Sequence, residues 1–388
     1  MDLSHILNHL GEDREQYFGA VSPPIIQTSN FALQDIAHLR EAMLDEYHHH
    51  LYSRGNNPTV EILRKKLAAL EGTEDALVVS SGAAAMAIAV IGVVQQGDHV
   101  ICVQNPYSWT RHLLTEFLPR FGVSATFVQG DQLTAIEQAI RPNTRLLFLE
   151  SPNTMTFGLQ DLAACARLAR QHGIITCIDN SCSSPLYQQP ASLGIDLVMH
   201  SATKYLNGHS DVVAGVICGS SALIRQIFDR AFMVIGPLLS PSDAALVLRG
   251  LRTLPLRMER SRQSALSIAD RLANHPAVAR VIHPWRDDFP QQELAHRQMS
   301  GTGGLFSMLV RTEDKDRIYR FTEALERFLI AVSWGGHESL VFPIAAVYDL
   351  PGHDNPPFPV NLIRLYIGLE DPELLWADLK QALRHLED

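Results

Sequence analysis

Cysteine is scarce in this chain, and long apolar runs are missing from it. The five cysteines are odd in number and include no CxxC pair: Cys102, Cys165, Cys177, Cys182 and Cys218. This odd number and spacing of cysteines argue against a disulfide framework and favour a reduced, cytoplasmic protein with buried thiols. No apolar run approaches the length of a membrane span, so we expect no membrane partner.

Basic residues are also in deficit. Lys and Arg number 32 against 42 Asp and Glu, which gives a net charge of −10. This balance argues against a general binder of nucleic acid or anionic membranes, and we expect neither as a partner. The opening stretch, MDLSHILNHLGEDREQYFGA, places acids where a signal or transit peptide needs bases and apolar residues, so we expect a cytoplasmic location.

Internal repeats are absent as well, and short apolar runs recur along the chain instead. These runs occupy residues 76–81, 99–104, 124–129, 145–150, 174–179, 197–201 and 213–219. Stretches of helical periodicity separate several of them, at 83–94, 110–121, 132–140 and 160–171. Apolar strands that alternate with helices indicate an α/β fold, with a mostly parallel seven-stranded sheet that carries helices on both faces.

The chain has 388 residues, which is more than one ordinary core accommodates. Residues 1–58 are irregular and rich in Pro, Asn, Ser and Gly, so we expect an N-terminal arm ahead of a main domain at 59–250. Within 220–275 the pattern is helical, with breaks expected at Pro237, Pro241 and Pro255. Residues 251–388 then predict a smaller α+β domain, with strands in GGLFSMLV, LIAVSW and NLIRLYIGL and helices at 314–329 and 372–386.

Polar residues cluster where the strands of the predicted parallel sheet end. In open α/β sheets, binding sites gather at the carboxyl ends of the strands. Read in order, these ends give Ser80-Ser81-Gly82, Asn105-Pro106-Tyr107, Glu150-Ser151-Pro152-Asn153, Asp179-Asn180 and Ser201-Ala202-Thr203-Lys204. They include one lysine, one aspartate, one aromatic ring and several small hydroxyl or glycine positions.

Each of these residues has an ordinary explanation when it is taken singly. A capped helix explains Gly82 and its two serines, although the free N–H groups at a helix start also suit a phosphate. An aspartate such as Asp179 commonly caps a helix or pairs with an arginine, and a lysine such as Lys204 is commonly solvated. A desolvated lysine is, however, a usable amine nucleophile. A lysine for a Schiff base, an acid for a ring nitrogen and a phosphate cradle are together what pyridoxal phosphate requires.

The stretch SATKYLNGHSDVVAG resembles the signature of the Cys/Met-metabolism family of pyridoxal-phosphate enzymes. That family contains cystathionine β-lyase, cystathionine γ-synthase, cystathionine γ-lyase and methionine γ-lyase. The similarity runs from YSRGNNPT through LAALEG, SSGAAAM, ESPNTMT and IDNS to SWGGHESL and LIRLYIGLED. It implies an aspartate-aminotransferase-like fold (fold type I), with 59–250 as the cofactor-binding domain and 251–388 as the substrate domain.

The resemblance also implies roles at the cofactor. Lys204 would form the Schiff base and then carry the α-proton, Asp179 would bind the pyridine nitrogen, and Tyr107 would stack on the ring as a second catalytic residue. The phosphate would be held by Ser81, Gly82, Ala83, Ser201 and Thr203. From the arm, Tyr52 and Arg54 would reach the phosphate of a neighbouring subunit, which implies a homotetramer built from dimers with shared active sites.

Four further residues are candidates for the amino-acid substrate. The resemblance implies that Arg364 clamps the α-carboxylate, that Ser333 assists it, and that Asn153 lies beside the ring where it contacts both cofactor and substrate. Glu338 has two open interpretations, contact with the distal amino group of cystathionine or capping of a helix.

Departures from the family pattern fall mainly at the mouth of the predicted site. Tyr107 is followed by Ser108-Trp109 where the family has Gly-Gly, so the role of Trp109 is open. Ala83 replaces a Met, and DNS replaces DNT after the strand of Asp179. Arg111 is either a reader of a distal carboxylate or part of a solvated helix face.

These features support a pyridoxal-phosphate-dependent carbon–sulfur lyase, similar to cystathionine β-lyase, that acts on cystathionine or a related sulfur amino acid by β- or γ-elimination. A γ-replacement on an activated homoserine ester is the alternative. A non-catalytic cofactor-binding homologue would be expected to have lost Lys204, Asp179 or Arg364, and all three are present. We expect no metal site, because His48, His49 and His50 are adjacent on an irregular arm and rarely converge on one ion in such a setting.

Overall fold

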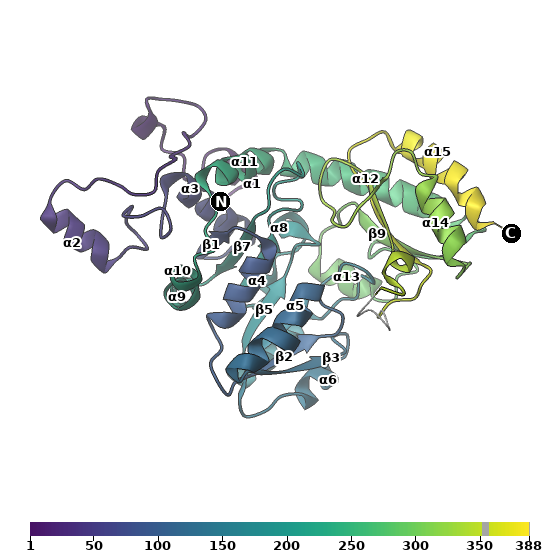
Figure 1. The fold of residues 1–388 in the computed structure, drawn as a ribbon, viewed down its shortest axis with the longest axis horizontal. Helices are drawn as coiled ribbons and strands as arrows, with labels where there is room; N and C mark the ends of the chain where they lie inside the picture. Colours follow the sequence, from purple (N-terminus) through teal and green to yellow (C-terminus); the bar gives the residue numbers. More distant parts are fainter. Residues whose placement is uncertain (351–356, 388) are drawn as a thin grey trace.

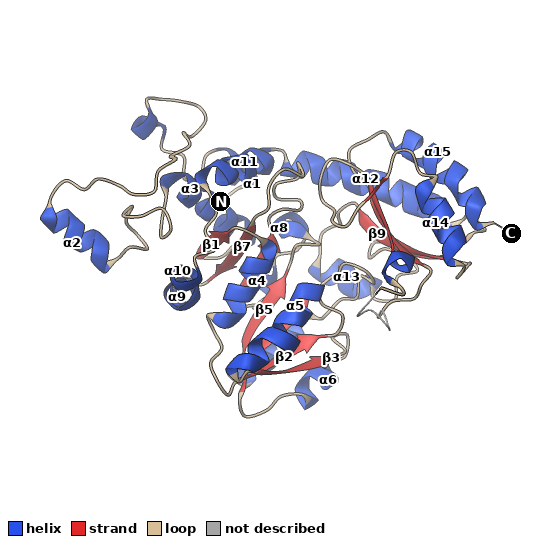
Figure 2. Cartoon of the chain, viewed as in Figure 1, coloured by secondary structure: helices blue, strands red, loops and turns tan. Residues whose placement is uncertain are grey.

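Two sheets, one large and one small, organise the computed structural model, which describes residues 1–350 and 357–387. The strands of the large sheet are β1 (Asp75–Val79), β2 (His99–Val103), β3 (Ser124–Val128), β4 (Thr144–Glu150), β5 (Ile175–Asp179), β6 (Leu197–Ser201) and β7 (Gly215–Gly219). Their spatial order is β1-β7-β6-β5-β4-β2-β3. Figure 2 shows these strands enclosed by helices, so the predicted α/β class and seven-stranded sheet are confirmed.

The sheet is parallel except at β7. Strands β6, β5, β4, β2 and β3 pair in parallel, whereas β7 runs antiparallel to both β6 and β1. The direct connection from β6 to β7 contains no crossover helix, and a strand can return beside its predecessor without one only by running the opposite way. The sheet is therefore mostly parallel, as predicted.

Successive residues of each strand enter different cores because side chains alternate between the faces of a sheet. In β4, Leu147 and Leu149 join the core that contains Leu63, Leu67 and Leu162. Leu146 and Phe148 join the opposite core. This burial on both faces explains the unbroken apolar character of the strands in the sequence.

Helices supply the other side of each core. On the first face they include α3 (Pro58–Glu71), α6 (Leu133–Gln138) and α7 (Leu162–Gln171). On the second face they include α4 (Gly82–Ile91), α5 (Ser108–His112) with its continuation to Phe121, and α9 (Ser221–Ile227). The shorter helices are α8 (Ser184–Tyr187), α10 (Met233–Ile235) and α13 (Gln292–Gln298).

Two of the prolines expected to interrupt helices start them instead. Pro241 is the first residue of α11 (Pro241–Arg252), and Pro255 lies in the first turn of α12 (Leu254–Ala273). Proline is accommodated there because the first backbone N–H groups of a helix have no intrahelical acceptor. Helix α12 runs from the large sheet toward the C-terminal unit (Figure 1).

The small sheet has the order β10-β11-β12-β9-β8 and lies in the C-terminal part of the chain. Its strands are β8 (Val278–Ile282), β9 (Leu305–Val310), β10 (Leu329–Ile330), β11 (Leu340–Pro343) and β12 (Leu362–Tyr366). Helices α14 (Lys315–Glu323) and α15 (Pro372–Ala382) pack with α12 around its core. The sequence predicted β9, β10, β12 and both helices, but it did not predict β8 or β11.

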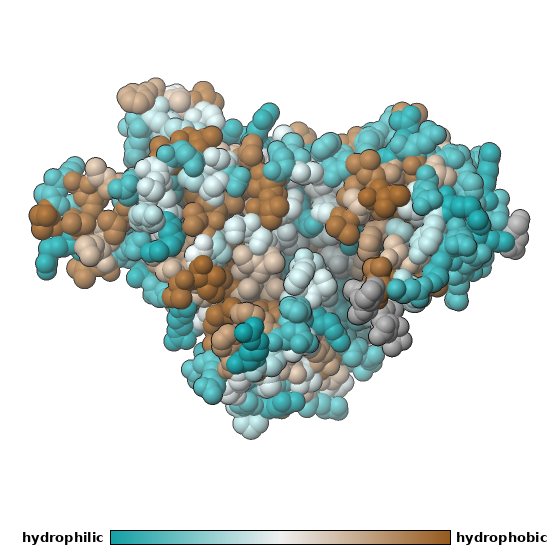
Figure 3. All heavy atoms as spheres, viewed as in Figure 1, coloured by the Kyte–Doolittle hydropathy of each residue, from teal (hydrophilic) through white to brown (hydrophobic). Residues whose placement is uncertain are grey.

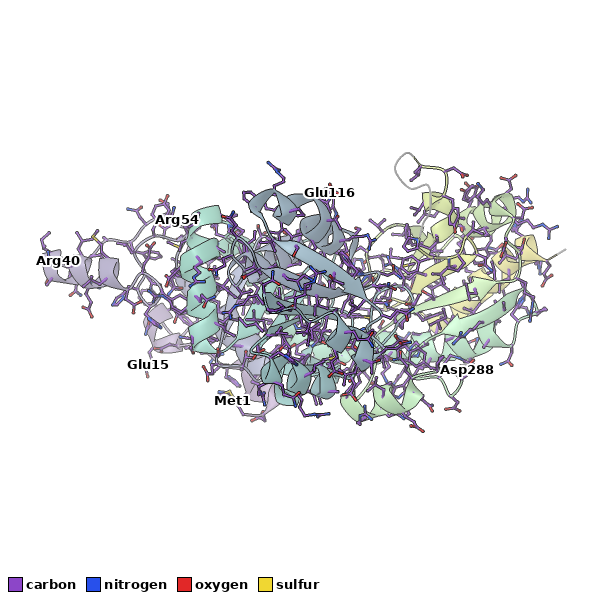
Figure 4. The ribbon with its side chains drawn as sticks, turned by 90° about the horizontal axis from the view of Figure 1, so that it is seen from below. Met1, Glu15, Arg40, Arg54, Glu116 and Asp288 are labelled. Carbon is purple, nitrogen blue, oxygen red and sulfur yellow. The ribbon has the colours of Figure 1, made fainter. Side chains whose placement is uncertain are left out.

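The N-terminal region begins against the large sheet and then leaves it. Helix α1 (Leu3–Asn8) is held by the buried Lys66, whose Nζ donates to the carbonyls of Ile6 at 2.9 Å and Leu7 at 3.1 Å. Helix α2 (Ile36–Leu44) projects to one side of the molecule in Figure 1, and Figure 4 labels Arg40 near the end of this arm. Apolar side chains are exposed on the region: Phe18, Val21, Ile25, Ile36, Met43 and Leu44.

Brown, apolar surface marks the arm and the neighbouring α9–α10 region in Figure 3. Val234 and Ile235 of α10 are exposed apolar residues of this region. Among the described residues, no helix combines the length and apolar character that a membrane crossing requires.

Candidate active site

Lys204 follows β6 and lies at the junction of the two sheets. Its Nζ donates a hydrogen bond to Oγ of Ser333, and it stands 5.4 Å from the ring centroid of Trp334. Burial lowers the pKa of Lys204 to about 8, and the positive charge of Arg364 acts in the same direction. The amine is therefore closer to its neutral, nucleophilic form than a surface lysine.

Ser333 connects the lysine to the arginine. Its backbone has a φ of 95°, a left-handed conformation that is rare for a residue with a side chain. Its carbonyl accepts a hydrogen bond from Nη2 of Arg364 at 3.2 Å while its hydroxyl meets Lys204. Gly335 allows this loop to approach, since a Cβ there would lie 2.8 Å from the backbone nitrogen of Tyr205.

Arg364 comes from β12 in the small sheet and is buried. Burial lowers the pKa of its guanidinium to about 10, so it still carries a full charge at neutral pH. Nη1 faces the sulfur of Met155 at 3.7 Å. No carboxylate of the described residues pairs with this guanidinium, which leaves a buried cation beside Lys204 that an anionic ligand would satisfy.

Asp179 ends β5, and two hydrogen bonds from Ser181 fix its carboxylate. Oδ1 accepts from the backbone N–H of Ser181 at 2.9 Å and from its hydroxyl at 2.5 Å. The same hydroxyl oxygen accepts from the backbone N–H of Ser201 at 2.7 Å. Burial raises the pKa of Asp179, whereas the hydrogen bonds from Ser181 act to lower it. Ser181, which stands where the family's DNT has a threonine, therefore supplies a hydroxyl group to this carboxylate.

The start of α4 provides a cradle next to Ser201. Ser81 caps the helix by accepting from the N–H of Ala84 at 3.0 Å, and Gly82 and Ala83 follow as its first residues. A Cβ on Gly82 would lie 2.6 Å from Cβ of Ser201, so only glycine lets the helix start and the end of β6 come this close. Thr203 is two residues after Ser201 in the chain, and its hydroxyl donates to the carbonyl of Ala214 at 3.1 Å.

Tyr107 stands at the start of α5, with a side chain that is 44% exposed. Its backbone N–H donates to Oε2 of Glu150 at 2.7 Å. Glu150 is the last residue of β4 and the register partner of Asp179 on β5. The sequence placed Glu150 at a strand end but gave it no role, because the contact with Tyr107 joins residues 43 positions apart.

Asn153 is buried, and its side-chain oxygen shapes the loop that follows β4. Oδ1 accepts from the backbone N–H groups of Met155 at 3.2 Å, Thr156 at 2.8 Å and Phe157 at 3.1 Å. Because Oδ1 is engaged, Nδ2 is the atom of this side chain that remains for a cofactor ring. The contact between Asn153 and that ring stays a prediction.

The remaining candidates lie farther out. Both carboxylate oxygens of Glu338 accept from the hydroxyl of Ser210, at 2.6 and 2.8 Å, and no helix begins at this residue, so the helix-cap interpretation is wrong. The guanidinium of Arg111 stacks on Phe127 at 4.8 Å and is exposed on α5. Trp109 is exposed on the same helix and contacts His112.

Tyr52 and Arg54 are in the arm and do not join the cluster around Lys204. Tyr52 is 47% exposed, and the guanidinium of Arg54 lies 5.8 Å from its ring centroid. Figure 4 labels Arg54 on the arm side of the molecule, away from the small sheet.

The three histidines of the arm contact three different groups. His48 pairs with Asp45, His49 contacts the carbonyl of Asp45, and His50 contacts Glu61. Over residues 1–350 and 357–387, no group of three or more His, Cys, Asp or Glu side chains could hold a metal ion.

The assembled residues fit pyridoxal phosphate. The helix start at Gly82 beside Ser201 suits a phosphate, the fixed carboxylate of Asp179 suits a ring nitrogen, and the amine of Lys204 suits an aldehyde. The buried cation of Arg364 adds a site for a substrate carboxylate.

Comparison with known proteins decides the family. Residues 5–384 match the model of a protein family that is described as "Cys/Met metabolism PLP-dependent enzyme". The chain belongs to this family. The predicted family and its cofactor, pyridoxal phosphate, are thereby confirmed.

Individual relatives cover almost the whole chain. An L-methionine gamma-lyase of Pseudomonas putida is 38% identical over 97% of this chain and 96% of its own length. A cystathionine gamma-lyase of Bacillus subtilis is 36% identical over 98% of this chain and 99% of its own. The crystal structure of metB from Corynebacterium glutamicum superposes with a TM-score of 0.93 at 33% identity, covering 100% of this chain and 99% of that one.

Proposed function

We propose that this protein is a pyridoxal-phosphate-dependent carbon–sulfur lyase that acts on cystathionine or a related sulfur amino acid by β- or γ-elimination. One observation carries the proposal: the amine of Lys204, with its pKa lowered to about 8, donates to the hydroxyl of Ser333, whose carbonyl accepts from the buried guanidinium of Arg364. A proton acceptor beside a carboxylate-binding cation is what removal of an α-proton from an amino acid requires.

The residues divide the work of holding the ligands. Ser81, Gly82, Ala83, Ser201 and Thr203 would hold the phosphate, with Thr203 exchanging its present bond to Ala214 for this task. Asp179 would hold the ring nitrogen and Tyr107 would cover the ring face. Asn153 would offer Nδ2 to a ring substituent, because its oxygen is engaged by the loop.

The remaining residues act on the substrate. When bound, pyridoxal phosphate would supply an electron-withdrawing ring that makes the α-hydrogen of the substrate acidic. Arg364 would bind the α-carboxylate with its guanidinium fork and so orient the α-hydrogen toward Lys204. Lys204 would take that proton on Nζ while Ser333 holds the amine in place. Glu338 would reach the distal amino group of cystathionine, which requires it to release Ser210.

Product analysis of the purified holoprotein tests the proposal. We would incubate it separately with L-cystathionine, with L-methionine, and with an activated homoserine ester plus cysteine. Pyruvate with homocysteine identifies β-elimination, and 2-oxobutyrate with cysteine or methanethiol identifies γ-elimination. New cystathionine from the homoserine ester and cysteine would show that the protein is a γ-replacement synthase and not a lyase. Absence of product from all three mixtures would overturn the assignment of substrate.

We further propose that the arm completes a neighbouring subunit. Its exposed apolar residues, together with Tyr52 and Arg54, support a role in which Tyr52 and Arg54 reach the phosphate of the neighbour, in a homotetramer of dimers. In this organisation residues 1–58 are the arm, 59–250 bind the cofactor and 251–388 bind the substrate. A cytoplasmic location is part of the same proposal, supported by five buried free cysteines.

Light scattering at low protein concentration, with and without residues 1–58, tests this assembly. We expect the full chain to scatter as a tetramer and the shortened chain to be smaller and to bind the cofactor poorly. A monomeric, fully loaded full-length protein would contradict the shared site.

A further inference from the structure

Glu150 is a buried carboxyl group to which the proposed chemistry assigns no task. Glu150 is 3% exposed and is the last residue of β4, at the carboxyl end of the strand. In the sheet, β4 lies between β5, which ends in Asp179, and β2, which leads to Tyr107. The end of this strand is therefore the point from which one side chain can reach both sides of the candidate ring site.

Both oxygens of Glu150 accept hydrogen bonds from backbone N–H groups of the loops that flank this site. Oε2 accepts from Tyr107 at 2.7 Å, and Oε1 accepts from Thr154 at 3.3 Å. Tyr107 carries the aromatic ring, and Thr154 follows Asn153 in the loop after β4. One side chain thus connects two loops that are separated by more than forty residues in sequence.

The relation of Glu150 to Asp179 is equally direct. The two are register partners on adjacent parallel strands, so their side chains point to the same face of the sheet. Burial, and then the charge of Asp179, raise the pKa of Glu150 to about 8, whereas the hydrogen bonds from the backbone of Tyr107 and Thr154 act to lower it. The two carboxyl groups therefore lie close enough for their charges to interact.

We propose that Glu150 is a positioning residue for the cofactor ring: its carboxyl group holds the backbone of Tyr107 and Thr154 and so fixes the two loops between which the ring lies. This inference rests on the proposed function, because it takes the ring of pyridoxal phosphate to lie beside Tyr107. Glu150 itself does not have to contact the cofactor.

The test compares Glu150→Gln with a matched control, Asp378→Asn. Asp378 is also a buried carboxylate, 6% exposed, and it accepts the backbone N–H groups of Glu326 at 3.0 Å and Arg327 at 2.8 Å. It lies on α15 of the C-terminal unit, away from Lys204. Each substitution turns one accepting oxygen into an NH2 group that faces a backbone donor.

Three measurements are made on each protein: the dissociation constant of pyridoxal phosphate, the visible circular dichroism of the bound cofactor, and hydrogen exchange of the peptides that contain Tyr107 and Thr154. For Glu150→Gln we expect about tenfold weaker cofactor binding, weaker visible dichroism and faster exchange in both peptides. Asp378→Asn should leave all three unchanged, although it lowers the melting temperature.

Wild-type values of affinity and dichroism in Glu150→Gln would overturn the inference. Should Glu150→Gln fail to fold, Glu150→Asp replaces it; this shorter acid cannot reach both N–H groups, and it too must show weaker dichroism and faster exchange for the inference to stand. A wild-type protein that binds no pyridoxal phosphate would instead overturn the proposed function, which is a distinguishable result.

Discussion

The side-chain amine of Lys204 donates a hydrogen bond to the hydroxyl of Ser333, a residue 129 positions farther along the chain. Lys204 follows the large sheet, whereas Ser333 lies in a loop between β10 and β11 of the small sheet. The proposed site therefore exists only where the two units meet.

Replacement of Lys204 by Ala should abolish covalent attachment of the cofactor. Its amine is the only lysine nitrogen among the described residues that lies against Ser333, so reduction of the wild-type holoprotein with borohydride should add the mass of the cofactor to the Lys204 peptide. Mass spectrometry of the digest measures this. Lys65→Ala, at an exposed position, should keep the label on Lys204, and a label on any other lysine would contradict the assignment.

The rate at which the apoprotein captures pyridoxal phosphate should rise with pH and reach half its maximum near pH 8. Only the neutral amine attacks an aldehyde, and the pKa of Lys204 is lowered to about 8. Because Arg364 helps to lower that pKa, Arg364→Gln should move the midpoint to higher pH. Arg111→Gln should leave it in place, and an unchanged midpoint in Arg364→Gln would show that the two charges do not interact.

Ser181→Ala should weaken binding of pyridoxal phosphate by about tenfold, in line with the loss of one hydrogen bond to a charged group. The hydroxyl of Ser181 donates to Asp179 and favours its ionised form, so its removal raises the pKa of Asp179 further. Titration of the apoprotein with cofactor measures the effect. Ser181→Thr keeps the hydroxyl and should bind as the wild type does; equal affinities of all three proteins would refute the role of this bond.

Gly82→Ala should lower the free energy of unfolding by about 1–3 kcal/mol, because the new Cβ would lie 2.6 Å from Cβ of Ser201. The same shift would open the cradle and weaken phosphate binding. Urea unfolding and cofactor titration measure the two effects. Gly158→Ala is the control, since the nearest atom to its Cβ is 3.4 Å away, and it should unfold as the wild type does. Equal stability of Gly82→Ala and the wild type would show that the helix start can yield.

Local patterns in the sequence were sufficient for the strands of the large sheet. The apolar runs at 76–81, 99–104 and 145–150 became β1, β2 and β4 within a few residues, because burial on both faces leaves a signal that does not depend on distant partners. Strand β8 carries no such signal, and the apolar run of β11 is short. β8 alternates buried and exposed residues irregularly, and β11 is only four residues long.

Contacts between residues far apart in the chain could not be predicted from the sequence. Glu150 was visible as a strand end, but its bonds to Tyr107 and Thr154 depend on the order of β5, β4 and β2 in the sheet. The sequence allowed Glu338 to cap a helix, whereas in the structure Glu338 lies in the loop before β11 and accepts a hydrogen bond from Ser210. The hydroxyl of Thr203 is engaged by Ala214, which no spacing reveals.

Consecutive residues were enough to identify the chemical groups of the site and the strand ends that carry them: an amine at Lys204, a carboxylate at Asp179 and a helix start at Gly82. The groups that surround them became known from the folded chain: Ser333 and Arg364 for the amine, Ser181 for the carboxylate and Ser201 for the helix start. Burial and periodicity are properties of a few consecutive residues, whereas a lowered pKa or a fixed carboxylate requires groups that the fold brings together from distant parts of the chain.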